Sequence, residues 1–177
     1  MFHSQRISII GTSGCGKTTL ARQLCQRLAI PHIELDALHW EANWTEVPTN
    51  TFRQRVEQSL KCDRWIVDGN YSQVRDMIWS RADTVIWLDY SLLVIMTRLV
   101  RRTWRRVVQQ EELWNGNRET WTLTFSRDSI LLWALQTYQK RRQEYPILLN
   151  QSAYAHLNLV HLKSPRQTYT WLSNLAT

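Results

Sequence analysis

Residues 11–18 carry a pattern that can bind phosphate, Gly-Thr-Ser-Gly-Cys-Gly-Lys-Thr, or G-x-x-x-x-G-K-T. The glycines allow successive backbone N–H groups to turn inward and form an anion-binding nest. The Lys17 amine can reach the β- and γ-phosphates of a nucleotide, and the Thr18 hydroxyl can ligate Mg²⁺. The pattern therefore predicts a nucleoside triphosphate site. Its expected members are Gly11, Thr12, Ser13, Gly14, Cys15, Gly16, Lys17, Thr18 and Thr19.

The elements on either side of this loop must hold it in place. Before it, residues 6–10 form a short β-branched run that is typical of a buried strand. After it, Leu20, Leu24 and Leu28 recur every four residues, which predicts an amphipathic helix. The positive dipole end of that helix would face the phosphates. The alternative is a chance glycine turn before a helix, and the two fitting flanking elements count against it.

Further along the chain, short apolar runs alternate with helical patterns, which predicts a parallel α/β sheet. Strands are expected at 31–36, 64–69, 83–89 and 157–162. Asp36, Asp68 and Asp89 fall at the C-terminal ends of three of them, at the edge where such sheets bind ligands. We therefore expect these carboxylates near the phosphate loop.

Helices are expected at 49–62, 70–80, 92–109, 126–144 and from Pro165 onward, with an irregular stretch at 111–124. Pro146 is expected to end or bend the helix before it. The buried face of helix 92–109 is expected to contain Leu93, Met96, Val100 and Val107. A basic stripe on another face contains Arg98, Arg101, Arg102 and Arg105. The tryptophans expected in the core are Trp65, Trp87 and Trp133.

Composition limits the class of protein. The chain has 177 residues, 44% of them apolar and 21% charged, which favours one globular domain. Three scattered cysteines suggest no disulfide framework and a reducing, cytoplasmic setting, and no Cys/His cluster suggests zinc. Neither a leader segment nor an apolar run long enough for a membrane span is evident. The net charge of +7 fits a polyanionic substrate, or weak non-specific binding to nucleic acid.

Across nearly its whole length the sequence resembles adenylate-kinase-like P-loop kinases. Within that group it resembles the bacterial FlaR-like, or DNA topology modulation, proteins. The matching segments are 11–21, 34–40, 65–71, 85–89, 113–119 and 162–167, together with the arginine-rich helix. The resemblance implies a three-layer α/β/α fold with a five-stranded parallel sheet in the order 2-3-1-4-5. It also implies a single kinase domain over 1–177, with an acceptor-binding segment at 31–63 and a lid at about 103–126.

The resemblance also implies roles for individual residues. Asp68 would hold Mg²⁺ through water, beside Thr18, and residues 69–71 would touch the acceptor. Arg98 and Arg102 would contact phosphate from the entry to the lid. Further arginines would contact the substrates: Arg118 on the lid, Arg127 on the return from it, and Arg166 along the adenine base. The expected acceptor-binding set is Asp36, His39, Trp40, Gly69, Asn70, Tyr71, Arg118 and Arg127.

Each of these interpretations has a structural alternative. Asp68 could cap the turn after its strand instead of holding Mg²⁺, and Asp36 could order its loop instead of contacting the substrate or acting as a base. A single histidine such as His39 is more often structural than functional. Trp40 and Trp44 could pack their loop instead of stacking on a bound ring. The run 140–142 is expected to be a solvated helix end.

The function that these residues favour is transfer of a phosphoryl group from ATP, with Mg²⁺, to a small-molecule acceptor, a nucleotide or nucleoside. Lys17, Arg98, Arg102 and Asp36 are the expected catalytic residues. One alternative is a DNA-binding, topology-modulating regulator that keeps ATP binding, although no helix-turn-helix or zinc-finger pattern is present. Another is a nucleotide-gated switch with slow hydrolysis. Neither the acceptor nor the oligomeric state follows from the sequence.

Overall fold

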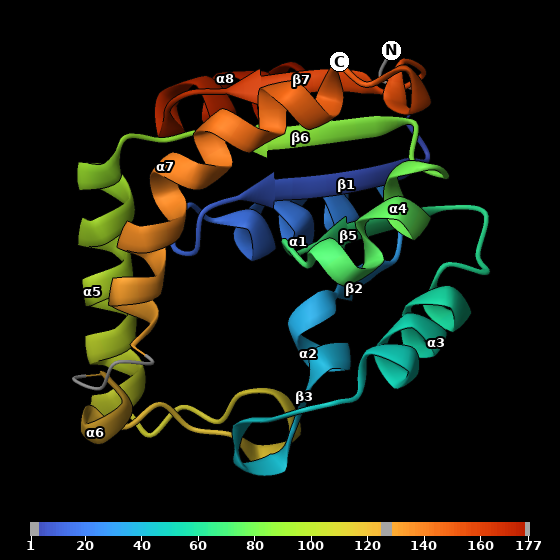
Figure 1. Cartoon of the computed structure of the whole chain (residues 1–177). Helices are drawn as coiled ribbons and strands as arrows, with labels where there is room; N and C mark the ends of the chain where they lie inside the picture. Colours follow the sequence, from blue (N-terminus) through green and yellow to red (C-terminus); the bar gives the residue numbers. More distant parts are fainter. Residues whose placement is uncertain (1–3, 125–128, 176–177) are drawn as a thin grey trace.

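A parallel sheet of five strands organises the computed structural model, which describes residues 4–124 and 129–175. In sheet order the strands are β2 (His32–Glu34), β5 (Trp65–Asp68), β1 (Arg6–Gly11), β6 (Thr84–Leu88) and β7 (Asn158–Leu162). Counted along the chain, this is the expected order 2-3-1-4-5 (Figure 1). The order places β1, and the loop that follows it, at the centre of the sheet.

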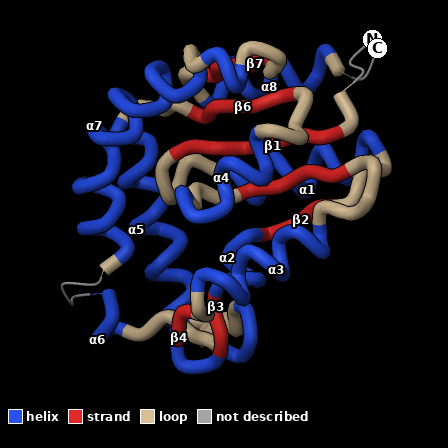
Figure 2. The backbone as a smooth tube through the Cα atoms, turned by 45° about the vertical axis from the view of Figure 1, so that its right-hand side comes forward, coloured by secondary structure: helices blue, strands red, loops and turns tan. Residues whose placement is uncertain are grey.

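Side chains alternate between the two faces of the sheet, and each face has its own core. Ile7 and Ile9 of β1 pack on the face covered by α1 and α8, whereas Ile10 packs on the face covered by α3, α4 and part of α7. The bounds of these helices are α1 (Lys17–Leu28), α3 (Thr49–Ser59), α4 (Ser72–Trp79), α7 (Ile130–Leu149) and α8 (Pro165–Asn174). The three-layer α/β/α architecture is therefore confirmed (Figures 1 and 2).

The helix that leaves β6 buries a different face from the one expected. In α5 (Leu92–Val108) the buried residues are Ile95, Leu99, Thr103 and Val107, spaced by four. Val107 is buried as expected, but Leu93 and Val100 are 78% and 51% exposed, so the prediction was wrong for these two residues. The helix is apolar on more than one side, and its packing beside α7 selects the face that is buried (Figure 1).

Helix α7 also departs from expectation, because it runs through Pro146 to Leu149. Pro146 was expected to end or bend the helix, and the structure shows that it does not end it. Burial of Tyr145 and packing of Leu148 and Leu149 against the core compensate for the hydrogen bond that the proline ring removes. Trp133, in the first half of the same helix, was expected in the core but is 51% exposed, whereas Trp65 and Trp87 are buried as expected.

The segment after β2 folds as a helix instead of extending the strand. The strand stops at Glu34, and α2 (Leu35–His39) follows at once, so Asp36 lies in the first turn of a helix and not at a strand end. A small antiparallel sheet then forms, which sequence analysis did not predict. It consists of β3 (Trp40–Glu41) and β4 (Thr45–Glu46), joined by the 3₁₀ turn η1 (Ala42–Trp44).

Between α5 and α7 the chain contains only short elements. These are the 3₁₀ turn η2 (Trp114–Gly116) and helix α6 (Trp121–Thr124), and a third turn, η3 (Ser152–Tyr154), precedes β7. Turn η2 lies against β3 and η1, although more than 70 residues separate them in sequence (Figure 2). In the described part of the chain, no helix combines the length and apolar character that a membrane crossing needs.

Candidate active site

The phosphate loop leaves β1 and enters α1 at the centre of the sheet. Gly11 has φ +143°, and a Cβ built on it would lie 2.5 Å from the carbonyl oxygen of Leu88, so only glycine fits there. Gly16, at φ +102°, turns the chain directly into α1. The Lys17 Nζ donates a 2.9 Å hydrogen bond to the Gly11 carbonyl, so the ammonium group lies over the loop. The loop has the form of an anion cradle, as its sequence predicted.

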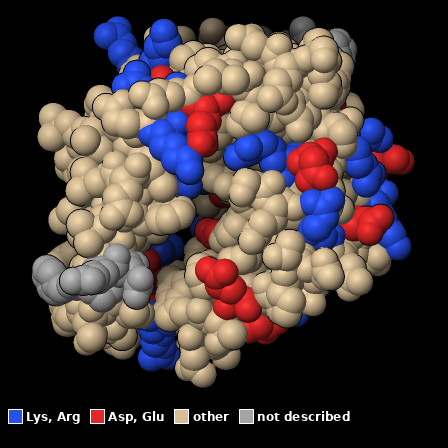
Figure 3. Space-filling model, in the orientation of Figure 1, with Lys and Arg blue, Asp and Glu red and all other residues tan. Residues whose placement is uncertain are grey.

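A large cleft opens from this loop. Its volume is about 1990 Å³, and its walls include loop residues 13–19, Asp36, Asp68, Arg98 and Arg102. Gly11 and Thr12 lie at the base of the loop and are not part of these walls. Figure 3 shows this face of the molecule hollowed near its centre, with acidic and basic side chains in the hollow.

Asp68, at the C-terminal end of β5, joins the loop to the neighbouring strand. Its side chain is 5% exposed, and its Oδ2 accepts a 2.6 Å hydrogen bond from the Thr18 hydroxyl. Its Oδ1 lies 2.7 Å from Nε2 of His32, at the start of β2. His32 was not predicted as a site residue. By binding Oδ1, His32 fixes the orientation of the Asp68 carboxylate, and Oδ2 remains beside the Thr18 hydroxyl.

The pair formed by Thr18 and Asp68 fits a magnesium ion that is shared with phosphates. Among the described residues no cluster of three or more His, Cys, Asp or Glu side chains could hold a metal ion. Mg²⁺ needs no such cluster, because it usually keeps several waters and binds one or two protein ligands together with substrate phosphates. A hydroxyl and a buried carboxylate next to a phosphate cradle provide that donor set.

Asp36 lies on another wall of the cleft, where α2 begins. Its Oδ1 accepts a 2.6 Å hydrogen bond from the Tyr71 hydroxyl. Burial raises the pKa of Asp36, while the Tyr71 hydrogen bond and the positive charges of Lys17 and Arg102 oppose that rise. Gly69 and Asn70, on the same connection as Tyr71, also line the cleft, and Asn70 exchanges two hydrogen bonds with the backbone of Gly11. The structure therefore brings residues 69–71 together with Asp36 and the loop.

His39 and Trp40 belong to an aromatic group behind Asp36. The His39 ring packs 4.4 Å from the Tyr71 ring and 4.9 Å from those of Trp40 and Phe52, measured between centroids. Burial lowers the pKa of His39, and the Glu46 carboxylate, 3.8 Å away, opposes this shift. These contacts are those of a structural histidine, although both His39 and Trp40 also line the cleft.

The two arginines that were expected to act together lie in different surroundings. Arg98 Nη1 donates to the Cys15 carbonyl at 3.1 Å, and its guanidinium group lies over the Tyr90 ring, so Arg98 is held at the phosphate loop. Arg102, one turn further along α5, has its nearest ion-pair oxygen 3.9 Å away on Glu119. Burial lowers the pKa of Arg102, and the like charge of Arg106 lowers it further.

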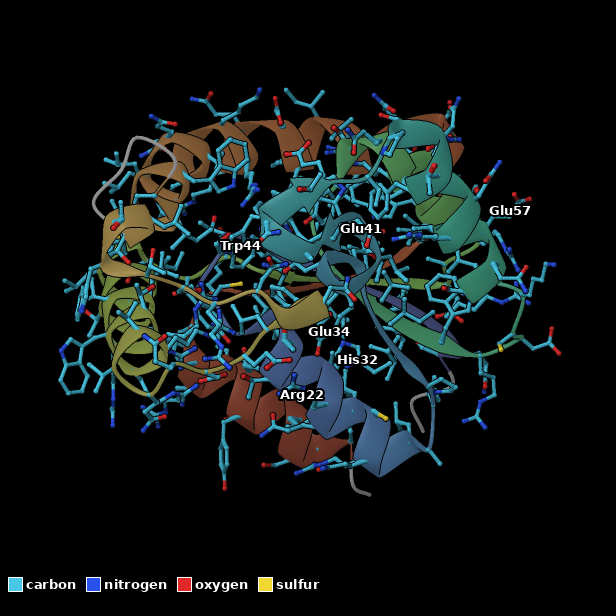
Figure 4. All side chains as sticks on the ribbon, turned by 90° about the horizontal axis from the view of Figure 1, so that it is seen from below. Arg22, His32, Glu34, Glu41, Trp44 and Glu57 are labelled. Atoms are coloured by element: carbon cyan, nitrogen blue, oxygen red, sulfur yellow. The ribbon has the colours of Figure 1, made fainter. Side chains whose placement is uncertain are left out.

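Turn η2 and the residues around it bind side chains and backbone groups of residues 34–44; we call residues 113–119 the latch. Its buried Asn117 donates to the Glu41 carbonyl at 2.7 Å and accepts from the Trp44 backbone N–H at 2.7 Å. Trp114 Nε1 donates to Glu34 at 2.8 Å. Figure 4 shows Glu34 beside His32 and Arg22, and Arg22 forms an ion pair with Glu34 at 2.8 Å. The latch therefore contacts segment 31–63, which sequence analysis expected to bind the acceptor.

Two predicted site arginines, Arg118 and Arg166, do not line the cleft. Arg118 is exposed, pairs with Glu112 at 3.5 Å and is not part of the cleft walls. Arg166 is exposed at the start of α8, where Pro165 and Thr168 line the cleft instead. Arg127 lies outside the described residues. Asp89 was expected near the loop. Its carboxylate pairs with Arg142 at 2.9 Å and with His161 at 3.1 Å, so Asp89 stabilises the fold.

Sequence reasoning missed Arg141, which was assigned to a solvated helix end. The structure corrects this, because Arg141 lines the cleft. A signal was present in the sequence: Ala134, Tyr138 and Tyr145 mark the buried face of α7, and Arg141 falls on that face by helical spacing. Asn117 and His32 had no comparable signal, because their partners lie far away in sequence.

Comparisons with known proteins agree with this fold. A family model described as an AAA domain matches residues 6–148. The uncharacterized protein YqaC of Bacillus subtilis (strain 168) is 30% identical over 125 residues, which are 68% of each chain. The shikimate kinase of Bacteroides thetaiotaomicron has a TM-score of 0.56 at 16% identity, covering 97% of this chain and 96% of its own. For the gluconokinase of Sinorhizobium meliloti 1021 the values are 0.53 at 20% identity, covering 97% and 93%.

Proposed function

The chain belongs to the AAA domain family, and we propose that it is a kinase that transfers the γ-phosphoryl group of ATP to a hydroxyl group of a small molecule. One observation carries this proposal. The carboxylate of Asp36, held by Tyr71, lines the same cleft as the phosphate loop and the Thr18–Asp68 pair. The fold likeness to proteins named shikimate kinase and gluconokinase supports it.

The proposed transfer uses residues on both sides of the cleft. The acceptor hydroxyl oxygen forms a bond to the γ-phosphorus, the bond from that phosphorus to the bridging oxygen breaks, and ADP leaves with the electron pair. The hydroxyl proton passes to the Asp36 carboxylate. The loop amides, Lys17 and Arg98 neutralise the phosphates from one side, and Arg102 faces them from the side of Asp36. Thr18 and Asp68 would hold Mg²⁺, and the ion would supply positive charge that stabilises the phosphates during the transfer.

A nucleotide or nucleoside is the proposed acceptor, on the basis of the resemblance to adenylate kinases. Residues 69–71 and Asp36 would contact it, and the aromatic rings of Trp40 and Trp44 border the space it would occupy. The latch, bound to that segment, would exclude water from the reacting groups.

Lys17→Ala tests the proposal. Turnover of ATP with an identified acceptor should fall about 100- to 1,000-fold, because a positive charge aimed at the transferring group is lost. Circular dichroism and thermal unfolding should stay unchanged, because within the described residues the Lys17 ammonium group hydrogen-bonds to a single loop carbonyl. Undiminished phosphorylation of the acceptor by the variant would refute the assignment.

The regulator alternative has its own test, a titration with duplex DNA across a salt series. For the kinase we expect binding to weaken steeply with salt and to show no sequence preference, as generic electrostatics requires. Sequence-specific binding that survives physiological salt would favour the regulator. ATP hydrolysis that no acceptor accelerates would favour the nucleotide-gated switch.

A further inference from the structure

The outward side of α5 carries apolar side chains that the rest of the described chain leaves largely uncovered. Leu93, Val100, Trp104 and Val108 are each more than half exposed, and Trp104 in the middle is 59% exposed. They lie on a different side of the helix from its buried residues. Thr97 lies between the first two, and its hydroxyl donates to the Leu93 carbonyl at 2.8 Å, so its polar group is satisfied within the helix. We call these five residues the α5 stripe.

The spacing of the α5 stripe is that of a seam between two helices. Positions 93, 97, 100 and 104 follow one another at intervals of four, three and four, the pattern by which one helix packs along another. Helix α7 covers the buried side of α5, and α5 forms the margin of the molecule opposite α3 (Figure 1). Contiguous exposed apolar surface marks an interaction site. The stripe is therefore suited to a second helix that this fold does not supply.

Positive charge borders the stripe. The sequence of α5 contains five arginines and no acidic residue. Arg101 is exposed next to Val100, and within residues 4–124 and 129–175 it forms no hydrogen bond or ion pair. Arg105, one turn further on, reaches Glu111 at 3.3 Å while 55% of its side chain stays exposed. Both arginines lie beside Trp104 on the helix surface. A helix packed on the stripe would meet this charge along one flank, which favours acidic residues there.

Other occupants match the surface less well. In a two-fold contact a patch meets itself, so α5 against α5 would bring arginines together with no carboxylate on either helix. The net charge of +7 on each chain also opposes self-association. The phosphates of a nucleic acid would match the arginines but would leave the apolar side chains without a partner. An acidic amphipathic helix satisfies both halves of the surface.

We propose that the α5 stripe docks an amphipathic helix of a partner protein, with apolar residues at heptad spacing and acidic residues on the flank that meets Arg101 and Arg105. Helix-on-groove recognition of this kind reads apolar anchors for affinity, and flanking charges select the partner. Neither the stripe residues nor Arg101 line the cleft, so the docked helix would lie outside the proposed active site. The inference therefore stands independently of phosphoryl transfer.

The test uses the full chain and two synthetic helices as probes. Each peptide is about three heptads long with leucine at positions a and d; one carries glutamate at e and g, and the other carries lysine. Like charges keep each peptide from pairing with itself. Fluorescence anisotropy of the labelled peptide, titrated with protein, measures binding. The variants are Trp104→Ser and Arg101→Glu, and Ile147→Ser, at an exposed apolar residue in the last turn of α7, is the matched control.

We expect saturable binding of the glutamate peptide, weakened about tenfold or more by Trp104→Ser and unchanged in the control. Arg101→Glu should weaken binding of the glutamate peptide and strengthen binding of the lysine peptide, because the charge beside the stripe is reversed. Thermal unfolding should stay close to wild type in all three variants, because the substituted side chains are exposed. Equal binding of both peptides, absence of saturable binding, or binding that Trp104→Ser leaves unchanged would overturn the inference.

Two further measurements test the other occupants. Sedimentation velocity of the chain alone should show a monomer, and a dimer that Trp104→Ser dissociates would make a second copy the occupant. Flotation with vesicles of about 70% phosphatidylcholine and 30% phosphatidylglycerol should leave the protein unbound. Retention on the vesicles that depends on Trp104 would make a lipid surface the occupant. Either of these results would overturn the proposed partner helix.

Discussion

The Tyr71 hydroxyl donates a 2.6 Å hydrogen bond to Oδ1 of Asp36, and so joins the loop after β5 to the first turn of α2. Asp36 is partly buried and lines the cleft, and burial raises its pKa while the Tyr71 hydrogen bond opposes that rise. Burial also raises the pKa of Tyr71, next to the Asp36 charge, so the phenol stays protonated and remains a donor. The tyrosine therefore favours the ionised form of the carboxylate that we propose as the base.

Tyr71→Phe should move the acidic limb of the pH profile. Loss of the hydroxyl removes an interaction that lowers the pKa of Asp36, so the carboxyl group holds its proton to a higher pH. The fall of kcat/KM on acidification should then begin at a higher pH than in wild type. Steady-state rates across a pH series measure this. Tyr154→Phe, a tyrosine that packs on Trp79 outside the cleft, should keep the wild-type profile, and equal profiles for all three proteins would contradict the role of Tyr71.

Asp36→Asn should separate activity from stability. Loss of the proton acceptor should lower kcat by about 100- to 10,000-fold. The folded-state pKa of Asp36 is raised, so its contribution to stability is greatest at low pH and is lost as pH rises through that pKa. At pH 7 the wild type carries the cost of a buried charge and the amide does not. Thermal unfolding at pH 7 should therefore occur at an equal or higher temperature, and a clear decrease would show that Asp36 has a structural role.

His32→Ala should weaken the response to magnesium. His32 contacts the Asp68 carboxylate and orients it, and removing such a supporting group typically costs about 10- to 100-fold in metal affinity. A magnesium titration at constant nucleotide should show a higher half-saturation, with most activity restored at high Mg²⁺. His156→Ala, an exposed histidine bonded only to the Trp79 carbonyl, is the control. If both variants respond to Mg²⁺ as wild type does, Asp68 needs no such support.

Asn117→Ala should release the latch. The side chain of Asn117 bonds Glu41 and Trp44 across the two segments, and breaking such buried hydrogen bonds costs on the order of 1–3 kcal/mol locally. Backbone amides of residues 40–46 and 113–119 should exchange hydrogen faster, and KM for the acceptor should rise more than KM for ATP. Mass spectrometry of exchange checks the first expectation and kinetics the second. Asn50→Ala, at an exposed position of α3, should change neither, and wild-type exchange in Asn117→Ala would refute the latch.

The sequence predicted the parts of the site that depend on contiguous residues or on the shared edge where parallel strands end. The phosphate loop depends on contiguous residues, whose glycines and flanking patterns give its form. Thr18 and Asp68 are 50 residues apart, yet each follows a central strand of one sheet, so their meeting could be expected. The alternation of strands and helices predicted a parallel α/β sheet, whereas the three layers and the strand order were implied by the resemblance to kinases.

The tertiary structure decided what no local pattern specifies. The face of α5 that is buried depends on α7, because both sides of α5 carry apolar residues. Pro146 was tolerated inside a helix because packing outweighed a lost hydrogen bond. His32 and Asn117 acquire their roles from partners that lie far away in the sequence. The sequence by itself determined a cradle for phosphate, and the packing of distant segments decided which side chains face the acceptor.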